Sequence, residues 1–255
     1  MVIKWDITLP ELTGDAVRSA YVYLPKAAQR EEHRRFPVLY MFDGHNVFWD
    51  QDATYGKSWG MERYLDETDT PLIVAAVECN HSPNHGRLSE YAPYTFQAPG
   101  LGRIQGRGKE TMEWMVHTFK PYIDQHFPTL PDRAHTFLGG SSMGGLMSLY
   151  GVTAYNAVFS RGACLSPSVW CASARLDRLL KEAELAEDTV LYLDYGSQEL
   201  QDHPGMAGRF GKVVSRLMER GVWVDARIVP HGEHCEASWE RQIPFFMQTL
   251  FYGLE

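Results

Sequence analysis

Apolar residues along this chain occur in two patterns. Short continuous runs such as 38–42 and 72–77 are apolar at nearly every position, which is typical of strands covered on both faces of a sheet. Longer stretches carry apolar residues every three or four positions, as helices with one buried face do. The runs predict strands at 16–24, 37–42, 72–78, 135–139, 161–165, 189–194 and 222–229, and the periodic stretches predict helices at 110–127, 143–155, 174–185, 206–220 and 236–252.

This alternation of strands and helices predicts an α/β fold with a mainly parallel central sheet and helices on both faces. We find no internal repeat and no Gly/Ser linker, so residues 1–255 are expected to form a single domain. Pro244 should kink the last helix or mark a restart. The stretch 80–108 is rich in Gly, Pro, His and Asn, and we expect it to be a loop insertion over the active site.

The composition and charge of the chain argue against nucleic acid and membranes as binding partners. The formal net charge of −8 disfavours nucleic acid, because an acidic surface repels phosphates. No apolar run approaches the ~20 residues that span a bilayer, and the first residues show no signal-peptide pattern, so we expect a cytoplasmic protein without a membrane partner. The 4 cysteines are too sparse for a disulfide framework and are expected to be reduced. Many aromatic residues are compatible with a homo-oligomer.

One segment carries a chemical signature. The strand predicted at 135–139 continues into Gly140-Ser-Ser-Met-Gly-Gly145 and then a helix, which is the strand–turn–helix setting of the G-x-S-x-G motif. Only Ser142 has glycine two residues before and two residues after it. We therefore predict that Ser142 is a nucleophile, and that the backbone N–H of Met143 faces the developing oxyanion.

A serine hydroxyl needs a base, and the base needs an acid that orients it. With the chain order Ser, acid, His, the base should follow the last strand. His234 lies directly before the final helix and is preferred, with His231 as the alternative. The acid should follow the strand at 189–194. Asp194, Glu199 and Asp202 are candidates, and position favours Glu199 over Asp202 without excluding the latter.

The turn after the strand at 37–42 should supply a second oxyanion donor. Gly44 allows a sharp turn there, so the N–H of His45 or that of Asn46 could complete the hole. The pair His231 and His234 has no nearby third ligand, and we expect neither a metal nor a cofactor. Four side chains near the expected active-site edge are candidates for binding substrate: Trp49, Trp59, Trp170 and Arg87. For Arg87 we favour an ion pair with Glu90 that fixes the long loop, and binding of an anionic ligand group is the alternative.

With these motifs in this order, the sequence resembles the putative-esterase branch of the α/β-hydrolase superfamily. That branch includes esterase D-like enzymes, feruloyl and acetyl-xylan esterases of carbohydrate esterase family 1, and trilactone siderophore esterases. The resemblance covers the chain from about Val17 to its C-terminus and rests on segments in a fixed order and spacing: 39–46, 87–93, 140–145, 165–168, 196–199 and 232–234.

The resemblance implies that Ser142 is the nucleophile, His234 the base and Glu199 the acid, which raises Glu199 over Asp202. The family more often has Gln at the position of His45, and this difference could bear on substrate fit. We therefore expect a serine carboxylic-ester hydrolase that acts on small acyl or aryl esters or on acylated carbohydrates, as feruloyl and acetyl esterases do. The alternatives are a trilactone siderophore esterase, and an acyltransferase or non-catalytic binding member of the fold.

Overall fold

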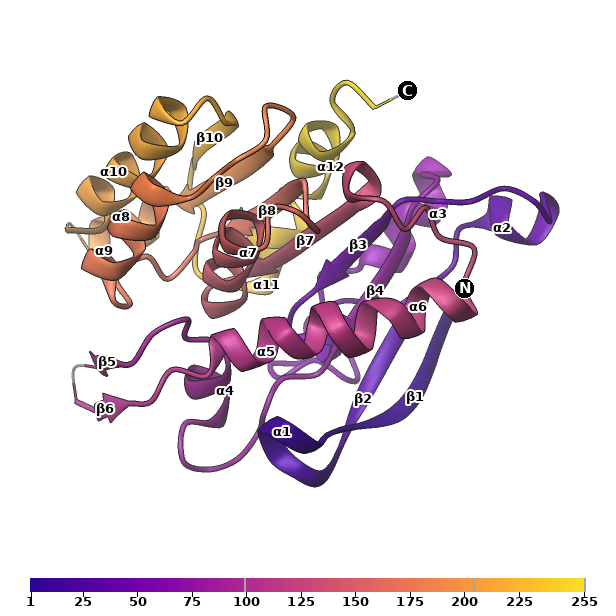
Figure 1. Cartoon of the computed structure of the whole chain (residues 1–255), viewed down its shortest axis with the longest axis horizontal. Coiled ribbons are helices and arrows are strands. Elements are labelled where there is room, and N and C mark those ends of the chain that lie inside the picture. Colours follow the sequence, from indigo (N-terminus) through magenta and orange to yellow (C-terminus); the bar gives the residue numbers. More distant parts are fainter. Residues whose placement is uncertain (99, 204, 255) are drawn as a thin grey trace.

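The centre of the protein is one large sheet. A computed structural model describes residues 1–98, 100–203 and 205–254. Its main strands are β1 (Val2–Leu9), β2 (Gly14–Tyr23), β3 (Val38–Met41), β4 (Ile73–Val77), β7 (Thr136–Ser141), β8 (Arg161–Leu165), β9 (Val190–Gly196) and β10 (Trp223–Val229). They form an eight-stranded sheet in the order β1-β2-β4-β3-β7-β8-β9-β10 (Figure 1). β2 is antiparallel to both of its neighbours, β1 and β4. The remaining neighbouring strands, in the order β4-β3-β7-β8-β9-β10, are all parallel to one another.

Helices cover both faces of this sheet. One face carries α5 (Gly108–Trp114), the π-helical turn η2 (Met115–Phe119), α6 (Lys120–His126), α7 (Met143–Ala154), α8 (Ser173–Glu182) and α10 (Gly205–Glu219). The other face carries α3 (Met61–Thr68), α11 (Glu236–Glu240) and α12 (Ile243–Phe251). Shorter elements connect these layers: α1 (Pro10–Thr13), α2 (Lys26–Arg30), η1 (Gly44–Asn46), α4 (Gly86–Glu90), β5 (Phe96–Ala98), β6 (Gly102–Ile104), η3 (Arg133–His135) and α9 (Ser197–Asp202).

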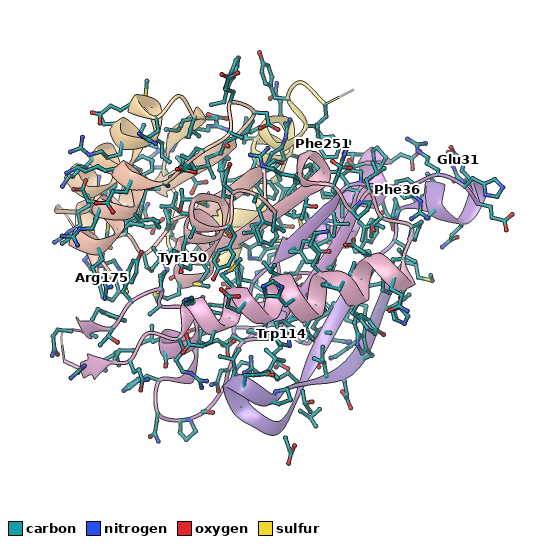
Figure 2. The ribbon with its side chains drawn as sticks, viewed as in Figure 1. Glu31, Phe36, Trp114, Tyr150, Arg175 and Phe251 are labelled. Atoms are coloured by element: carbon teal, nitrogen blue, oxygen red, sulfur yellow. The ribbon has the colours of Figure 1, made fainter. Side chains whose placement is uncertain are left out.

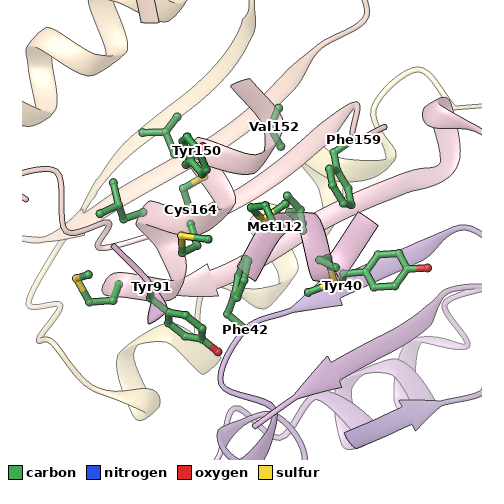
Figure 3. Close-up of a cluster of buried hydrophobic side chains, with 14 of the residues drawn as sticks. Tyr40, Phe42, Tyr91, Met112, Tyr150, Val152, Phe159 and Cys164 are labelled. Carbon is green, nitrogen blue, oxygen red and sulfur yellow. The ribbon is translucent and has the colours of Figure 1, made fainter. Parts of the chain in front are cut away.

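The two helical layers enclose two separate cores. Successive side chains of a strand point to opposite faces, so Val38 and Tyr40 of β3 pack with the α5–α7 side, whereas Leu39 and Met41 pack with the α12 side. Figure 3 shows part of the first core, where Tyr40 lies near Phe159, a residue of the segment between α7 and β8. Side chains fill the space between the sheet and the helices on both sides (Figure 2). The continuous apolar runs are thus explained by burial on both faces.

The prediction of an α/β fold with a mainly parallel sheet and helices on both faces is confirmed. Each predicted strand and helix has a counterpart. The predicted helix 236–252 is divided into α11 and α12, and Pro244 lies in the first turn of α12. A proline fits there because that turn has no intrahelical acceptor for its N–H. The proline therefore marks a helix restart.

Several elements were missed by the pattern analysis. β1 is an edge strand that pairs only with β2. It alternates polar and apolar residues because Trp5 and Ile7 pack against the core while the residue between them faces solvent. The long helix predicted at 110–127 is interrupted by η2. The segment 80–108, predicted to be a loop, contains α4 and the antiparallel pair β5–β6. A buried ion pair between Arg18 and Glu90, with an N–O distance of 2.7 Å, fixes it to the sheet.

Within the described ranges, no helix combines the length and apolar character needed to cross a membrane.

Candidate active site

Ser142 occupies a strained turn between β7 and α7. Its backbone has φ 57° and ψ −120°, a conformation that non-glycine residues rarely adopt. The chain reverses so tightly that a Cβ at Gly140 would lie 2.8 Å from the carbonyl carbon of Gly144. The turn lifts the half-buried Ser142 side chain out of the sheet edge, whereas the preceding Ser141 is buried. The glycines of the motif are therefore required by close backbone contact.

His234 and Glu199 form a hydrogen-bonded pair at the same edge of the sheet, beyond the ends of β10 and β9. His234 Nδ1 lies 2.6 Å from Glu199 Oε2. His234 follows β10, and Glu199 lies in the first turn of α9 after β9. The two loops touch closely, because a Cβ at Gly196 would overlap the carbonyl of Gly232. A hydrogen bond of 3.1 Å from Gln198 N–H to Gly232 O also joins them.

Glu199 is held by three donors. Besides His234, the Ser166 hydroxyl donates to Oε1 at 2.6 Å and the Gly196 N–H donates to Oε1 at 2.9 Å. Burial alone would raise the pKa of Glu199, but the hydrogen bonds from His234 and Ser166 outweigh burial and lower this pKa. The carboxylate is therefore kept charged, as a group that orients and stabilises an imidazolium must be.

Ser142, Glu199 and His234 line one cavity of about 570 Å³. The Ser142 hydroxyl lies 3.5 Å from the Ser168 hydroxyl, and no hydrogen bond between Ser142 and His234 is present among the described residues. A serine side chain needs only rotation about χ1 to change its partner, and such contacts commonly tighten when substrate binds. Trp239 packs edge-on against the His234 ring at 5.0 Å between centroids, which limits the orientations open to that ring.

The turn after β3 faces the same serine from the opposite side. His45 lies in η1, and its ring, together with Ser142, lines a second cavity of about 420 Å³. The N–H of Asn46 donates to Asp43 O at 2.8 Å and is used by the turn itself. Of the two second oxyanion donors left open by the sequence, this favours the N–H of His45. Burial lowers the pKa of the His45 side chain, so its neutral form is favoured.

Arg87 holds this turn in place. Its Nε and a terminal nitrogen each donate to the Asp43 carboxylate at 2.7 Å. Burial would raise the pKa of Asp43, but the Arg87 guanidinium prevails and lowers it. The Asp43 N–H also donates to the Tyr91 hydroxyl at 3.1 Å. The sequence-based pairing of Arg87 with Glu90 is wrong, because Glu90 is taken by Arg18.

The candidate substrate-binding residues divide into two groups. Arg87 and Trp170 line the cavity that Ser142, Glu199 and His234 share. Trp59 is 3% exposed and packs against Trp239 in the core, so it does not reach that cavity. The Trp49 indole donates to Glu62 at 3.0 Å and faces another surface hollow. The expectation that Trp49 and Trp59 meet the cavity fails because the turn after β3 folds back over the α3 side of the sheet.

Sequence reasoning gave no role to Ser166 and did not explain Asp194. Ser166, at φ 42°, accepts a hydrogen bond of 3.1 Å from the Trp239 indole while donating to Glu199. Its N–H donates to Asp194 Oδ1 at 3.1 Å. Asp194 is 1% exposed, and burial raises its pKa to about 7. The motif Leu165-Ser-Pro-Ser168 was visible in the sequence, but its contacts depend on the neighbouring strand.

The comparisons with known proteins agree with this geometry. The family model described as "Putative esterase" matches residues 15–251. The chain belongs to this esterase family. That membership confirms the prediction of a carboxylic ester hydrolase with the α/β-hydrolase fold.

Individual relatives are distant in sequence. The uncharacterized protein YbbA of Bacillus subtilis (strain 168) is 22% identical over 213 residues, which cover 80% of this chain and 79% of YbbA. The structure of an IroE-like serine hydrolase from Shewanella oneidensis superposes with a TM-score of 0.76 at 16% identity, covering 100% of this chain and 82% of that one. A ferulic acid esterase superposes with a TM-score of 0.68 at 15% identity, covering 98% and 97%. These structures share the fold.

Proposed function

We propose that this esterase hydrolyses its substrate through Ser142, His234 and Glu199, by way of a covalent acyl-enzyme. The observation that carries the proposal is that the three side chains line one cavity while His234 Nδ1 is bonded to Glu199 at 2.6 Å. That bond directs His234 Nε2 away from Glu199 and leaves it available as a base. The strained Ser142 turn supports the same assignment.

In the proposed reaction, His234 Nε2 takes the Ser142 proton while Oγ attacks the ester carbonyl carbon. The resulting oxyanion accepts hydrogen bonds from the N–H groups of Met143 and His45. When the tetrahedral intermediate collapses, the bond to the alcohol oxygen breaks and His234 returns the proton to that oxygen. Water, deprotonated by His234, then attacks the acyl-enzyme carbonyl carbon. The bond to Ser142 Oγ breaks, His234 returns the proton to Oγ, and the carboxylic acid is released. Glu199 stays ionised throughout and balances the charge on His234.

The proposed substrates are small acyl or aryl esters, or acylated carbohydrates of the feruloyl or acetyl type. The wall of the cavity includes Trp170, Tyr195 and Met206. Trp170 is fixed by an edge-on contact with Phe96, at 5.5 Å between centroids, and presents a rigid apolar surface to the cavity. Such a wall suits an aromatic acyl group or the face of a sugar. The likeness in fold to a ferulic acid esterase is in line with this proposal.

The first experiment is an ester panel run with wild-type protein and Ser142→Ala. The panel contains p-nitrophenyl esters from acetate to octanoate, methyl ferulate, acetylated xylo-oligosaccharides and a trilactone siderophore. We expect turnover that Ser142→Ala abolishes, and labelling by a fluorophosphonate probe that also disappears. Ser141→Ala is the matched control and should still be labelled. Turnover that survives in Ser142→Ala would overturn the nucleophile assignment.

Trp170→Ala tests the substrate class separately. If the indole contacts an aryl acyl group, kcat/KM for methyl ferulate should fall by about 10-fold or more, in line with the loss of a buried aromatic contact. The value for p-nitrophenyl acetate, whose acyl group carries no aromatic ring, should change less. An equal loss for both esters would indicate that Trp170 only supports the fold.

A further inference from the structure

Three side chains that can bind a metal gather beside the reaction centre. His45, Cys79 and His81 each offer one ligand atom, and these atoms lie within 4.8 Å of one another. Cys79 Sγ is 4.0 Å from His81 Nε2, and the rings of His45 and His81 are 4.9 Å apart between centroids. None of these side chains takes part in the proposed hydrolysis, where only the backbone of His45 acts. The cluster therefore needs an explanation of its own.

The two ring nitrogens of His45 have different surroundings. The residue is 4% exposed, and its Nε2 lies 2.9 Å from the Thr54 hydroxyl. The other nitrogen, Nδ1, is buried and has no hydrogen-bond partner within the described part of the chain. When Nε2–H donates to Thr54, Nδ1 keeps a free lone pair. A second-sphere hydrogen bond that fixes the tautomer in this way is typical of ligating imidazoles. A bound cation would also satisfy an otherwise unpaired buried nitrogen.

We propose that His45, Cys79 and His81 bind a divalent cation of the zinc class. Thiolate sulfur and imidazole nitrogen are the ligands that Zn²⁺ prefers, and bonds of about 2.0–2.3 Å place tetrahedral ligand atoms roughly 3.3–3.8 Å apart. The spacing of 4.0 Å between Cys79 and His81 is already near that range. The His81 side chain is 54% exposed and can move closer to Cys79 by giving up its 3.0 Å contact with Glu78 Oε1.

The binding step is a ligand exchange in which the hydrated cation loses bound water molecules as the protein ligands bind. The Cys79 thiol loses its proton to solvent and forms a sulfur–metal bond, while both imidazoles bind in their neutral form. Three protein ligands leave the fourth tetrahedral position open. The cavity that the three residues line is also lined by Ser142 and His234. The ion would therefore lie at the wall of the same cavity as the nucleophile, and we expect it to slow ester hydrolysis.

This site was not visible in the sequence, which led us to expect no metal. Only His231 and His234 were considered there, because they are neighbours along the chain. His45 follows β3, whereas Cys79 and His81 follow β4. β3 and β4 are adjacent parallel strands, so the segments after their carboxyl ends meet at one edge of the sheet. The parallel pairing brings the ligands together.

Cobalt substitution tests the site without relying on hydrolysis. Full-length protein, freed of metal with a chelator, is titrated with Co²⁺ under reducing conditions. We expect a thiolate-to-cobalt charge-transfer band in the near ultraviolet, tetrahedral bands in the visible, and displacement of both by one equivalent of Zn²⁺. Cys79→Ser should remove the charge-transfer band. Cys79→Ser and His81→Ala should each weaken Zn²⁺ binding by at least the ~100-fold that loss of an outer-sphere partner can cost.

Two variants control for other ligands. Cys235→Ser removes a half-buried thiol next to His234, and His85→Gln removes an exposed imidazole from the segment that carries His81. Both should bind Co²⁺ like wild type. A charge-transfer band that persists in Cys79→Ser, or that is lost in Cys235→Ser, would overturn the assignment, as would its absence from wild type. Circular dichroism and the Tm of each variant show that it is folded. Because the readout is spectroscopic, it distinguishes failure of this site from failure of the proposed hydrolysis.

Discussion

Two acid–base pairs flank Ser142, and they differ in what they can do. On one side, Asp43 and Arg87 form two parallel hydrogen bonds of 2.7 Å. On the other side, Glu199 and His234 share a single hydrogen bond of 2.6 Å. A guanidinium in a protein does not release its proton, so the first pair can only stabilise the turn after β3. An imidazole exchanges its proton near neutral pH, so the second pair can take part in chemistry.

The difference also appears in exposure. The Asp43 carboxylate is 7% exposed, as is that of Glu199, but the His234 side chain is 48% exposed and Arg87 is 33% exposed. Each buried carboxylate is thus paired with a more accessible cation, and only His234 combines this access with a free ring nitrogen. In both pairs a buried carboxylate fixes a neighbouring basic side chain. The pair after β3 supports the turn, and we propose that the pair after β9 and β10 transfers a proton.

Among variants of the two pairs, His234→Ala should have the largest effect. Removing the base should lower kcat by roughly 10⁴-fold or more, because Ser142 then has no proton acceptor. His231→Ala is the matched control, and it should keep most of the activity. Steady-state rates on a p-nitrophenyl ester measure both variants. Near-full activity in His234→Ala together with loss of activity in His231→Ala would show that His231, and not His234, is the base.

Glu199→Gln should have the next largest effect. The amide keeps the shape but removes the charge that stabilises the His234 imidazolium, so kcat should fall about 10³–10⁴-fold. The Tm should change little. Asp202→Asn, an exposed position in the same helix, serves as the control and should be nearly silent. The reverse ranking of Glu199 and Asp202 would identify Asp202 as the acid.

Asp194→Asn should change the pH dependence of stability. The pKa of Asp194 rises from its ordinary 3.8 to about 7 in the folded protein, so the folded state binds this proton more tightly than the unfolded state. The free energy of unfolding should therefore fall as pH rises from about 4 to 7, by at most about 4 kcal/mol at ~1.36 kcal/mol per pKa unit. The Asn variant should lack this decline. Urea unfolding at several pH values measures it, and parallel curves for the two proteins would contradict the assignment.

Arg87→Lys should have the smallest effect. Lysine keeps the charge next to Asp43 but not the two-pronged contact, so we expect a loss of about 1.5–3 kcal/mol in the free energy of unfolding. A slightly displaced His45 turn should lower kcat by about 10-fold, well below the effect of His234→Ala. Urea unfolding and initial rates measure the two quantities. A fall in kcat as large as that of His234→Ala would give Arg87 a direct part in catalysis.

Sequence patterns were sufficient where neighbours along the chain determine the structure. The turn around Ser142 was predictable because glycines at 140 and 144 report tight backbone contact. The order of strands and helices followed from apolar runs and helical spacing. Trp59 and Trp49 illustrate the limit. Their position in a loop suggested exposure, but the direction in which that loop turns depends on packing against α3 and α12.

The sequence by itself determined the α/β class, the mainly parallel sheet and the family, and it singled out the residues that we propose as nucleophile, base and acid. These features depend on local periodicity, on glycine spacing and on chain order, which a linear sequence records. Only the tertiary structure decided that Arg87 pairs with Asp43, that Ser166 holds Glu199, and that His45 meets Cys79 and His81. Such contacts join the ends of different strands, and they exist only once parallel pairing has aligned those ends at one edge of the sheet.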